Sequence, residues 1–290
     1  MAATIQYIER IIERFQNAHQ ANANTEARLG NVIELKASVA DEVMVTADLH
    51  GHRTNFNIIR RIADLAKHPK RHLILQEVCH GGPKHPYSGG CMSHQMLEDV
   101  AKLKVDFPNQ VHFLMSNHEW AELTDYPIIK NQKVLNLMFR TGMQEMYGPA
   151  TDKVRDAYVP FLRTLPLAVR VDKGIWISHT LPENVRRKGF DLSLLDDELG
   201  DEDLVENGPL FHFIWGRDFS QENADAFAAK IDADILIHGH EPSENGYEVP
   251  NARQVILDSH GDHGVYVMLP VGEKLSQSDV VERIKPLQKN

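Results

Sequence analysis

Residues 42–52 read EVMVTADLHGH, and this stretch decides the fold expected for the chain. A short, β-rich apolar run ends directly in Asp48 and His50, and alternation along an extended backbone places both side chains on the same side. A carboxylate and an imidazole then face one point. Taken alone, Asp-x-His is more typical of a structural turn than of a functional site, because motifs this short often arise by chance.

The same sequence pattern repeats along the chain: an apolar run is followed by polar or glycine-containing residues and then by a helical stretch. The predicted strands span residues 42–47, 72–75, 111–115, 168–171, 175–178, 235–237, 254–257 and 265–269. Candidate functional residues directly follow several of these runs. In α/β sheets binding sites collect at the carboxyl ends of the strands, so the sequence predicts an α/β fold with its site at that edge.

Three later strand ends also supply nitrogen and oxygen ligands. They deliver Asn117 and His118, then His179, and finally His240. Each segment has an ordinary structural alternative, such as a helix cap or a satisfied core histidine. Together, in a fixed order, they carry the ligand types that hold borderline divalent metals, and this favours a metal site.

The composition fits one large domain. The chain has 290 residues, 42% hydrophobic and 25% charged, and a chain of this size buries roughly three quarters of its unfolded surface. The net charge of −10 argues against general nucleic-acid binding, because phosphate backbones recruit clustered lysine and arginine. The 16 histidines make metal binding possible.

The N-terminal segment predicts a packing helix over residues 5–15, followed by a further helix and connection up to residue 40. Its interleaved charges do not fit a signal peptide, and no run of about 18 uncharged apolar residues occurs. We therefore expect a cytoplasmic protein without membrane association, in which Cys79 and Cys91 are reduced thiols.

Four motifs together resemble the ordered signature of the phosphoprotein (serine/threonine) phosphatase branch of the calcineurin-like metallophosphoesterases. They are DLHG at 48–51, NHE at 117–119, His179 and GHE at 239–241. The similarity extends between the motifs, for example through LPLAVRVDKGIWISH at 165–179. The resemblance implies a four-layer α/β/β/α sandwich with two packed mixed β-sheets. The expected organisation is a helical extension at 1–40, the metallophosphoesterase domain at 41–270 and a tail at 271–290.

The resemblance also implies a role for each matched residue. Asp48 and His50 would bind the first of two divalent ions, Asn117, His179 and His240 the second, and Glu77 both. His118 would donate a proton to the leaving oxygen, and Arg217 would hold the phosphate. Manganese is the first expectation for the ions, with iron, zinc or cobalt as alternatives.

The second motif departs from the family. Where relatives have Gly-Asp-x-x-Asp-Arg-Gly, this chain reads QEVCHGG at 76–82. The bridging aspartate becomes Glu77, the aspartate that orients the catalytic histidine aligns with His80, and the phosphate-binding arginine aligns with Gly81. We expect these changes to weaken leaving-group protonation and phosphate affinity.

Two loops are candidates to supply the groups that the second motif lacks. The segment PKHPYSGGCMS at 83–93 is either a lid that brings His85 or Tyr87 to the site or a plain surface loop. In the segment 258–263, His260 and His263 are hypothesised to replace part of what is missing.

The function expected first is hydrolysis of phosphate monoesters such as phosphoserine or phosphothreonine in proteins. The partner would then be a phosphorylated protein or a small phosphate ester. The alternatives are a nucleoside polyphosphate or small phosphodiester hydrolase, and a non-catalytic pseudophosphatase that acts as a binding module.

Overall fold

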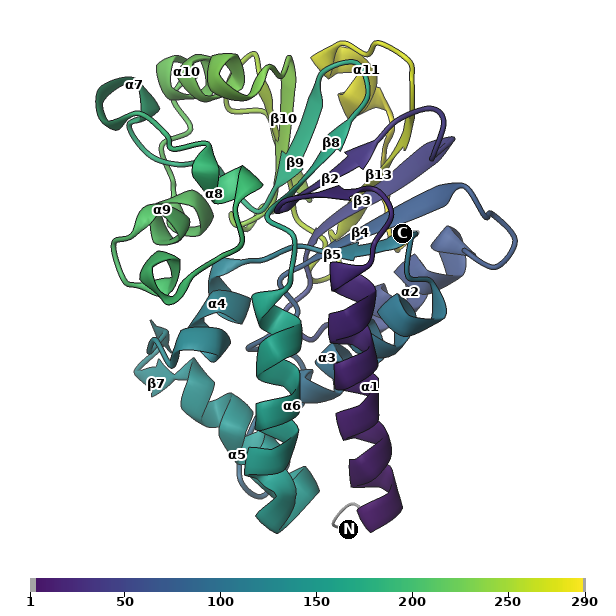
Figure 1. The fold of residues 1–290 in the computed structure, drawn as a ribbon, viewed down its shortest axis with the longest axis vertical. Coiled ribbons are helices and arrows are strands. Elements are labelled where there is room, and N and C mark those ends of the chain that lie inside the picture. The colour runs from purple at the N-terminus through teal and green to yellow at the C-terminus, as the bar shows by residue number, and fades with distance from the viewer. Residues whose placement is uncertain (1–3, 289–290) are drawn as a thin grey trace.

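The structure, a computed structural model, describes residues 4–288 and contains two large mixed β-sheets (Figure 1). The larger sheet has the strand order β1-β2-β8-β9-β10-β12-β11 and the smaller one the order β14-β13-β3-β4-β5. A separate hairpin consists of β6 (Ile129–Lys130) and β7 (Lys133–Val134). In spatial order, the strands of the larger sheet are β1 (Arg28–Leu29), β2 (Val32–Leu35), β8 (Ala168–Val171), β9 (Ile175–Ser178), β10 (Ile235–His238), β12 (Gln254–Leu257) and β11 (Tyr247–Glu248). Those of the smaller sheet are β14 (Ile284–Pro286), β13 (Val265–Pro270), β3 (Glu42–Asp48), β4 (Arg71–Gln76) and β5 (Val111–Phe113).

Helices surround the two sheets (Figure 1). The helices are α1 (Ile5–Ala23), α2 (Arg53–Ala63), α3 (Ser93–Asp106), α4 (Asn117–Thr124), α5 (Leu135–Tyr147), α6 (Thr151–Arg163), α7 (Val185–Lys188), α8 (Ser193–Asp196), α9 (Pro209–Trp215), α10 (Gln221–Ile231) and α11 (Gln277–Glu282). Helices α2 and α3 contact the smaller sheet, α10 contacts the larger one, and α1 lies beside α3 and α6. None of the helices described in residues 4–288 combines the length and apolar character needed to cross a bilayer.

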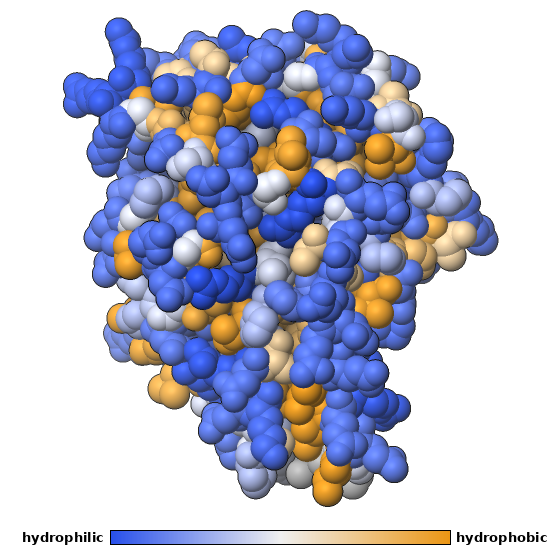
Figure 2. Space-filling model, in the orientation of Figure 1, coloured by the Kyte–Doolittle hydropathy of each residue, from blue (hydrophilic) through white to orange (hydrophobic). Residues whose placement is uncertain are grey.

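Apolar side chains hold the layers together. Along β3, Val43 and Val45 belong to the cluster between the sheets, whereas Met44 belongs to the cluster under the helices. A strand buried on both faces in this way reads as a continuous apolar run, and the sequence shows that run. On the face drawn in Figure 2, apolar side chains occur in small groups among hydrophilic ones. The predicted α/β/β/α sandwich is confirmed.

All eight predicted strands form, with ends shifted by at most two residues, but the N-terminal expectation is wrong in one respect. Residues 28–35, expected to be helix and connection, form β1 and β2. These strands pair around a two-residue turn at Gly30-Asn31, where Gly30 has a φ of +58°, and β2 pairs in parallel with β8. The β-branched residues of β2 gain packing partners that a helix would not offer. In the expected C-terminal tail, β14 pairs with β13.

Parallel pairing decides where the functional residues meet. Strands β3, β4 and β5 run parallel in the smaller sheet, and β9 and β10 run parallel in the larger one. Their carboxyl ends therefore open toward one another at the same edge of the sandwich. The pairing of β3 with β4 becomes irregular between Val45 and Asp48, which turns the end of β3 out of the regular ladder.

The packing of α1 generates a stability prediction. Phe15 is 1% exposed, and its ring centroid lies 5.9 Å from that of Tyr158 and 6.0 Å from that of Phe161. Phe15→Ala should lower the free energy of unfolding by about 3–5 kcal/mol, because it leaves a cavity between α1 and α6. Ile5, on the same helix but 76% exposed, provides the control. Urea unfolding that gives equal losses for Phe15→Ala and Ile5→Ala would contradict this view of α1.

Candidate metal centre

The structure brings all the predicted site residues together around one cavity of about 330 Å³ at the strand ends. The predicted residues that line the cavity are Asp48, His50, Glu77, Asn117, His118, Arg217 and His240. His179, directly after β9, is fully buried and contacts the side chains of both Asn117 and His240. Segments far apart in the sequence therefore contribute to one cluster, as their strand-end positions predict.

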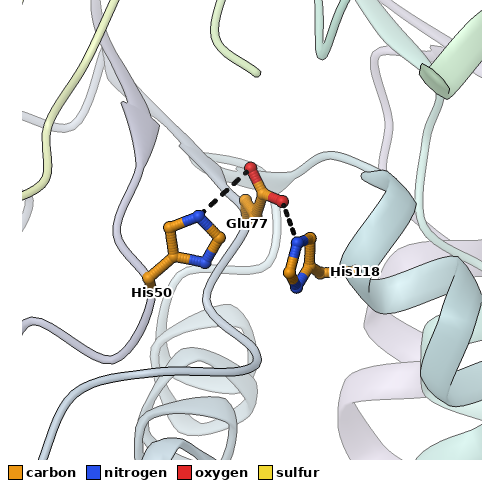
Figure 3. Close-up of side chains that lie close together, drawn as sticks. All are labelled: His50, Glu77 and His118. Carbon is orange, nitrogen blue, oxygen red and sulfur yellow. Dashed lines mark ion pairs between the residues drawn. The ribbon is translucent and has the colours of Figure 1, made fainter. Parts of the chain in front are cut away.

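Glu77 lies at the centre of this cluster. Its Oε1 is 3.2 Å from His118 Nε2, and its Oε2 is 3.8 Å from His50 Nε2 (Figure 3). The same Oε2 is 3.6 Å from His179 Nε2. Two triads of candidate ligands share this carboxylate, one with His50 and His118 and the other with His179 and His240. A carboxylate common to two triads is the arrangement that a bridged pair of ions requires.

The second triad is tightly packed. His179 Nε2 is 2.8 Å from Asn117 Oδ1 and 3.0 Å from His240 Nδ1. Its Nδ1 is 3.9 Å from Asp48 Oδ1, which also accepts a 3.0 Å hydrogen bond from the backbone N–H of His240. Gly239 permits this approach, because a Cβ there would lie 2.5 Å from Asp48 Oδ1.

The electrostatics of the cluster fit divalent cations. Burial, and the charge of Asp48 beside it, raise the pKa of Glu77 well above its usual value. Burial likewise raises the pKa of Asp48 to about 6. Burial lowers the pKa of His50 to about 3, and it lowers the pKa values of His118, His179 and His240 well below their usual range. Neutral imidazoles and two facing carboxylates are the donor set that such ions bind, and a cation would offset the carboxylate charges.

Backbone strain concentrates at the same place. His50, Glu77, His80 and His240 have φ values of 41°, 41°, 64° and 70°. Residues other than glycine rarely adopt this left-handed region, and conformations of this kind cluster at functional sites. All four residues lie outside the strands and line the cavity.

Buried hydrogen bonds hold the strained segments. The Glu77 carbonyl oxygen accepts from the N–H groups of Leu49 and His50, at 3.0 and 2.8 Å. Glu119 Oε1 accepts from the N–H groups that follow Glu77, those of Val78 and Cys79, at 3.0 and 2.9 Å. The glutamate of NHE is therefore a structural brace for the second motif.

Helix α4 presents Asn117 and His118 to the cavity in its first turn. Ser116 caps this helix, because its Oγ accepts from the N–H groups of His118 and Glu119 at 3.1 and 3.4 Å. The capping interpretation of this segment is confirmed, and it is compatible with the functional one, because the cap fixes where the two cavity residues begin.

The structure shows the surroundings of His80 and Gly81, two of the residues at which the second motif departs from the family. His80 keeps a direct contact with His118, with their Nδ1 atoms 2.8 Å apart. At Gly81, a Cβ would lie 2.4 Å from the His50 carbonyl oxygen, so no side chain fits in this backbone. The position that aligns with the family arginine therefore cannot supply a cation here.

Two cationic side chains line the cavity. The Nε of Arg217 is paired with Glu241, and no carboxylate within residues 4–288 lies within ion-pair distance of the Lys130 ammonium group. Lys130 comes from the β6–β7 hairpin, and its charge acts on both His50 and His260. The sequence interpretation missed this residue, because the hairpin is too short to leave a periodic signal.

The two candidate loops have different outcomes. The loop at 83–93 is a surface loop: its Tyr87 is 96% exposed, and His85 Nδ1 lies 3.4 Å from Glu145 Oε1, which holds it against α5. In the segment 258–263, His260 lines the cavity, whereas His263 is exposed outside it. The buried Cys79 and Cys91 are unpaired thiols.

The two-sheet sandwich positions this cluster of imidazoles, carboxylates and an amide as a candidate site for divalent metal ions. The family profile described as calcineurin-like phosphoesterase matches residues 42–244. The chain belongs to this family, and the family prediction is confirmed.

Similar proteins agree with the predicted branch. A probable serine/threonine-protein phosphatase of Encephalitozoon cuniculi is 21% identical in a match that covers 89% of this chain and 55% of the relative. This chain thus spans about half the length of that curated relative. A serine/threonine phosphatase structure from Saccharomyces cerevisiae has a TM-score of 0.66 at 16% identity, covering 93% of this chain and 85% of that one. A cold-active protein-tyrosine phosphatase from a Shewanella species has a TM-score of 0.56 at 16% identity, covering 82% and 77%.

Metal content provides the test of the shared carboxylate. Purified protein equilibrated with manganese and then desalted should retain about two ions per chain, and Glu77→Ala should lose most of both, because both triads use this residue. His240→Ala should lose about one ion. Elemental analysis by mass spectrometry measures the content, and His263→Ala is the control. Full retention by Glu77→Ala would contradict a shared ligand.

Proposed function

We propose that the chain is a phosphomonoesterase that uses two divalent ions and acts on phosphorylated serine or threonine in proteins. The observation that carries the proposal is the position of Glu77, whose carboxylate lies within 4.8 Å of a nitrogen of His50 in one group of candidate ligands and of nitrogens of His179 and His240 in the other. The name of the curated relative supports the choice of substrate. The unpaired thiols of Cys79 and Cys91 support the cytoplasm as the compartment.

Each predicted ligand has a role in this proposal. Asp48 and His50 would hold one ion, and Asn117, His179 and His240 the other, with Glu77 common to both. When bound, such ions lower the pKa of water and polarise phosphoryl oxygens. The rigid, strained backbone around Glu77 keeps the ligand atoms in place before the ions arrive, which lowers the ordering cost of binding.

His118 is assigned as a proton donor and not as a ligand. Its Nε2 lies near both Glu77 and His50, so geometry alone would allow it to join their triad. Its Nδ1 is engaged by His80, which leaves Nε2 to act at the cavity. This arrangement suits a metal ligand as well as a general acid or base, and the match of NHE at 117–119 to the family motif favours the proton donor.

The substrate phosphate would be bound by Arg217 and Lys130. They approach the cavity from the end of α9 and from the β6–β7 hairpin. Two cations can neutralise the charge of a phosphate monoester, and their separate origins let them contact different oxygens. Lys130 would in this way supply the positive charge that Gly81 cannot.

The first experiment is hydrolysis of 4-nitrophenyl phosphate by the manganese-loaded protein. The wild type should turn over, and Glu77→Ala should lose activity by a factor of about 1,000 or more, because both ions depend on this side chain. His263→Ala should behave as the wild type. A folded wild type that binds manganese but hydrolyses neither this ester nor a phosphopeptide would instead support the binding-module alternative.

A second experiment tests the phosphate-binding cations. Lys130→Gln should raise KM for a phosphopeptide about tenfold, the loss expected for one charge-assisted hydrogen bond, while kcat changes less. Lys133 is the matched control, because it pairs with Lys130 in the same hairpin and is exposed but does not line the cavity. Equal KM values for Lys130→Gln and Lys133→Gln would show that Lys130 does not bind the substrate phosphate.

A further inference from the structure

Behind the cavity, three side chains form a buried row that the metal ligands do not include. His118 Nδ1 is 2.8 Å from His80 Nδ1, and His80 Nε2 is 2.7 Å from Glu122 Oε1. The side chains of His80 and Glu122 are both 0% exposed. A fully buried carboxylate in line with two imidazoles is costly to desolvate, so its hydrogen bonds must be made well.

Each member of the row is fixed by its surroundings. The backbone N–H of His80 donates to Ser93 Oγ at 3.0 Å, and the His80 ring packs edge-on against Phe139. Tyr158 OH donates to the second carboxylate oxygen of Glu122, Oε2, at 3.0 Å. Glu122 and His118 lie on α4 four residues apart, so they occupy the same face of one helix. The geometry of the row is therefore determined by packing on both sides.

Hydrogen-bonding rules assign the protons. An ionised Glu122 can only accept, so His80 Nε2 must carry a proton. The other nitrogen of a neutral His80 is then an acceptor, and His118 Nδ1–H donates to it. This leaves His118 Nε2 facing the cavity, 3.2 Å from Glu77 Oε1.

We propose that His80 and Glu122 are positioning residues that hold His118 as the proton donor for phosphate esters with poor, alkoxide leaving groups. This rests on the proposed phosphomonoesterase function. In the step, the oxygen of a water molecule forms the new bond to phosphorus and the bond to the ester oxygen breaks. The unprotonated Nε2 of His118 accepts a proton from that water and passes it to the departing oxygen, so His118 ends the step in its starting form. The Nδ1–H of His118 stays bonded to His80 throughout.

The proposal defines the substrate class. A serine or threonine alkoxide is strongly basic and needs a proton as it leaves, whereas a nitrophenolate leaves readily without one. The carboxylate of Glu122 acts through His80, in place of a carboxylate in direct contact with His118. The row thus supplies what the family aspartate supplies, with the negative charge one imidazole farther away.

The test compares leaving groups. Glu122→Gln keeps the volume and one acceptor oxygen but removes the charge. It should lower kcat for a phosphoserine peptide about tenfold or more, and kcat for 2,4-dinitrophenyl phosphate by less than about threefold. Tyr158→Phe removes one hydrogen bond to Glu122. It should lower the ratio of kcat for the phosphoserine peptide to kcat for 2,4-dinitrophenyl phosphate, but by a smaller amount than Glu122→Gln.

Two controls separate positioning from general damage. Glu98 is another buried glutamate held by two tyrosines, Tyr7 and Tyr147, outside the cavity, so Glu98→Gln should leave the ratio of the two kcat values unchanged. In a His118→Asn background, Glu122→Gln should have almost no further effect, because the two residues act as one unit.

Nuclear magnetic resonance of the metal-free protein gives a readout without catalysis. Long-range ¹H–¹⁵N spectra should show His80 protonated at Nε2 and His118 at Nδ1, and Glu122→Gln should move the His80 signals most. A wild type that hydrolyses no ester would overturn the phosphatase function and this role together. An active wild type in which Glu122→Gln slows both esters equally, or a His80 protonated only at Nδ1, would overturn the positioning role alone.

Discussion

Two carboxylates buried against each other are the constraint on which the rest of the structure depends. Asp48 and Glu77 stand at the ends of adjacent parallel strands, and burial raises the pKa values of both. Such a pair is costly unless cations or protons offset the charge. The surrounding neutral histidines bring no positive charge of their own, so divalent metal ions would offset the charge of this pair. The strained backbone and the brace from Glu119 serve to keep this unfavourable arrangement in place.

The altered second motif is better described as a rearrangement than as a loss. At position 80 an imidazole replaces the carboxylate of the family motif. Glu122, which lies one turn after His118 on α4, supplies a negative charge next to that imidazole. At position 81 the close approach of the His50 carbonyl excludes any side chain, and Lys130 reaches the cavity from a hairpin. Glu122 and Lys130 both come from segments outside the second motif. The motif alone therefore suggests that the site has fewer charged groups than the structure shows.

Much of the fold followed from local patterns. Seven of the eight predicted strands span four or more residues of mainly apolar or β-branched sequence, and the eighth, 235–237, spans three; packing on both faces favours that composition. Apart from β2 (Val32–Leu35), the strands that were missed are two or three residues long: β1, β6, β7, β11 and β14. Segments this short have no period to detect, and they become strands only because a neighbouring edge offers hydrogen bonds. The expected helix before residue 40 failed because β2, although four residues long, pairs with β8, a strand that lies far away in the sequence.

The sequence by itself determined the class of fold, the strand ends that carry the candidate ligands and the family, because these depend on residue types at fixed short spacings. Only the tertiary structure decided which atoms meet. It made Glu77 common to two triads, put Glu122 behind His80 and brought Lys130 to the cavity. These contacts join residues from different loops and helices, and their distances depend on how the two sheets pack, which no local spacing encodes.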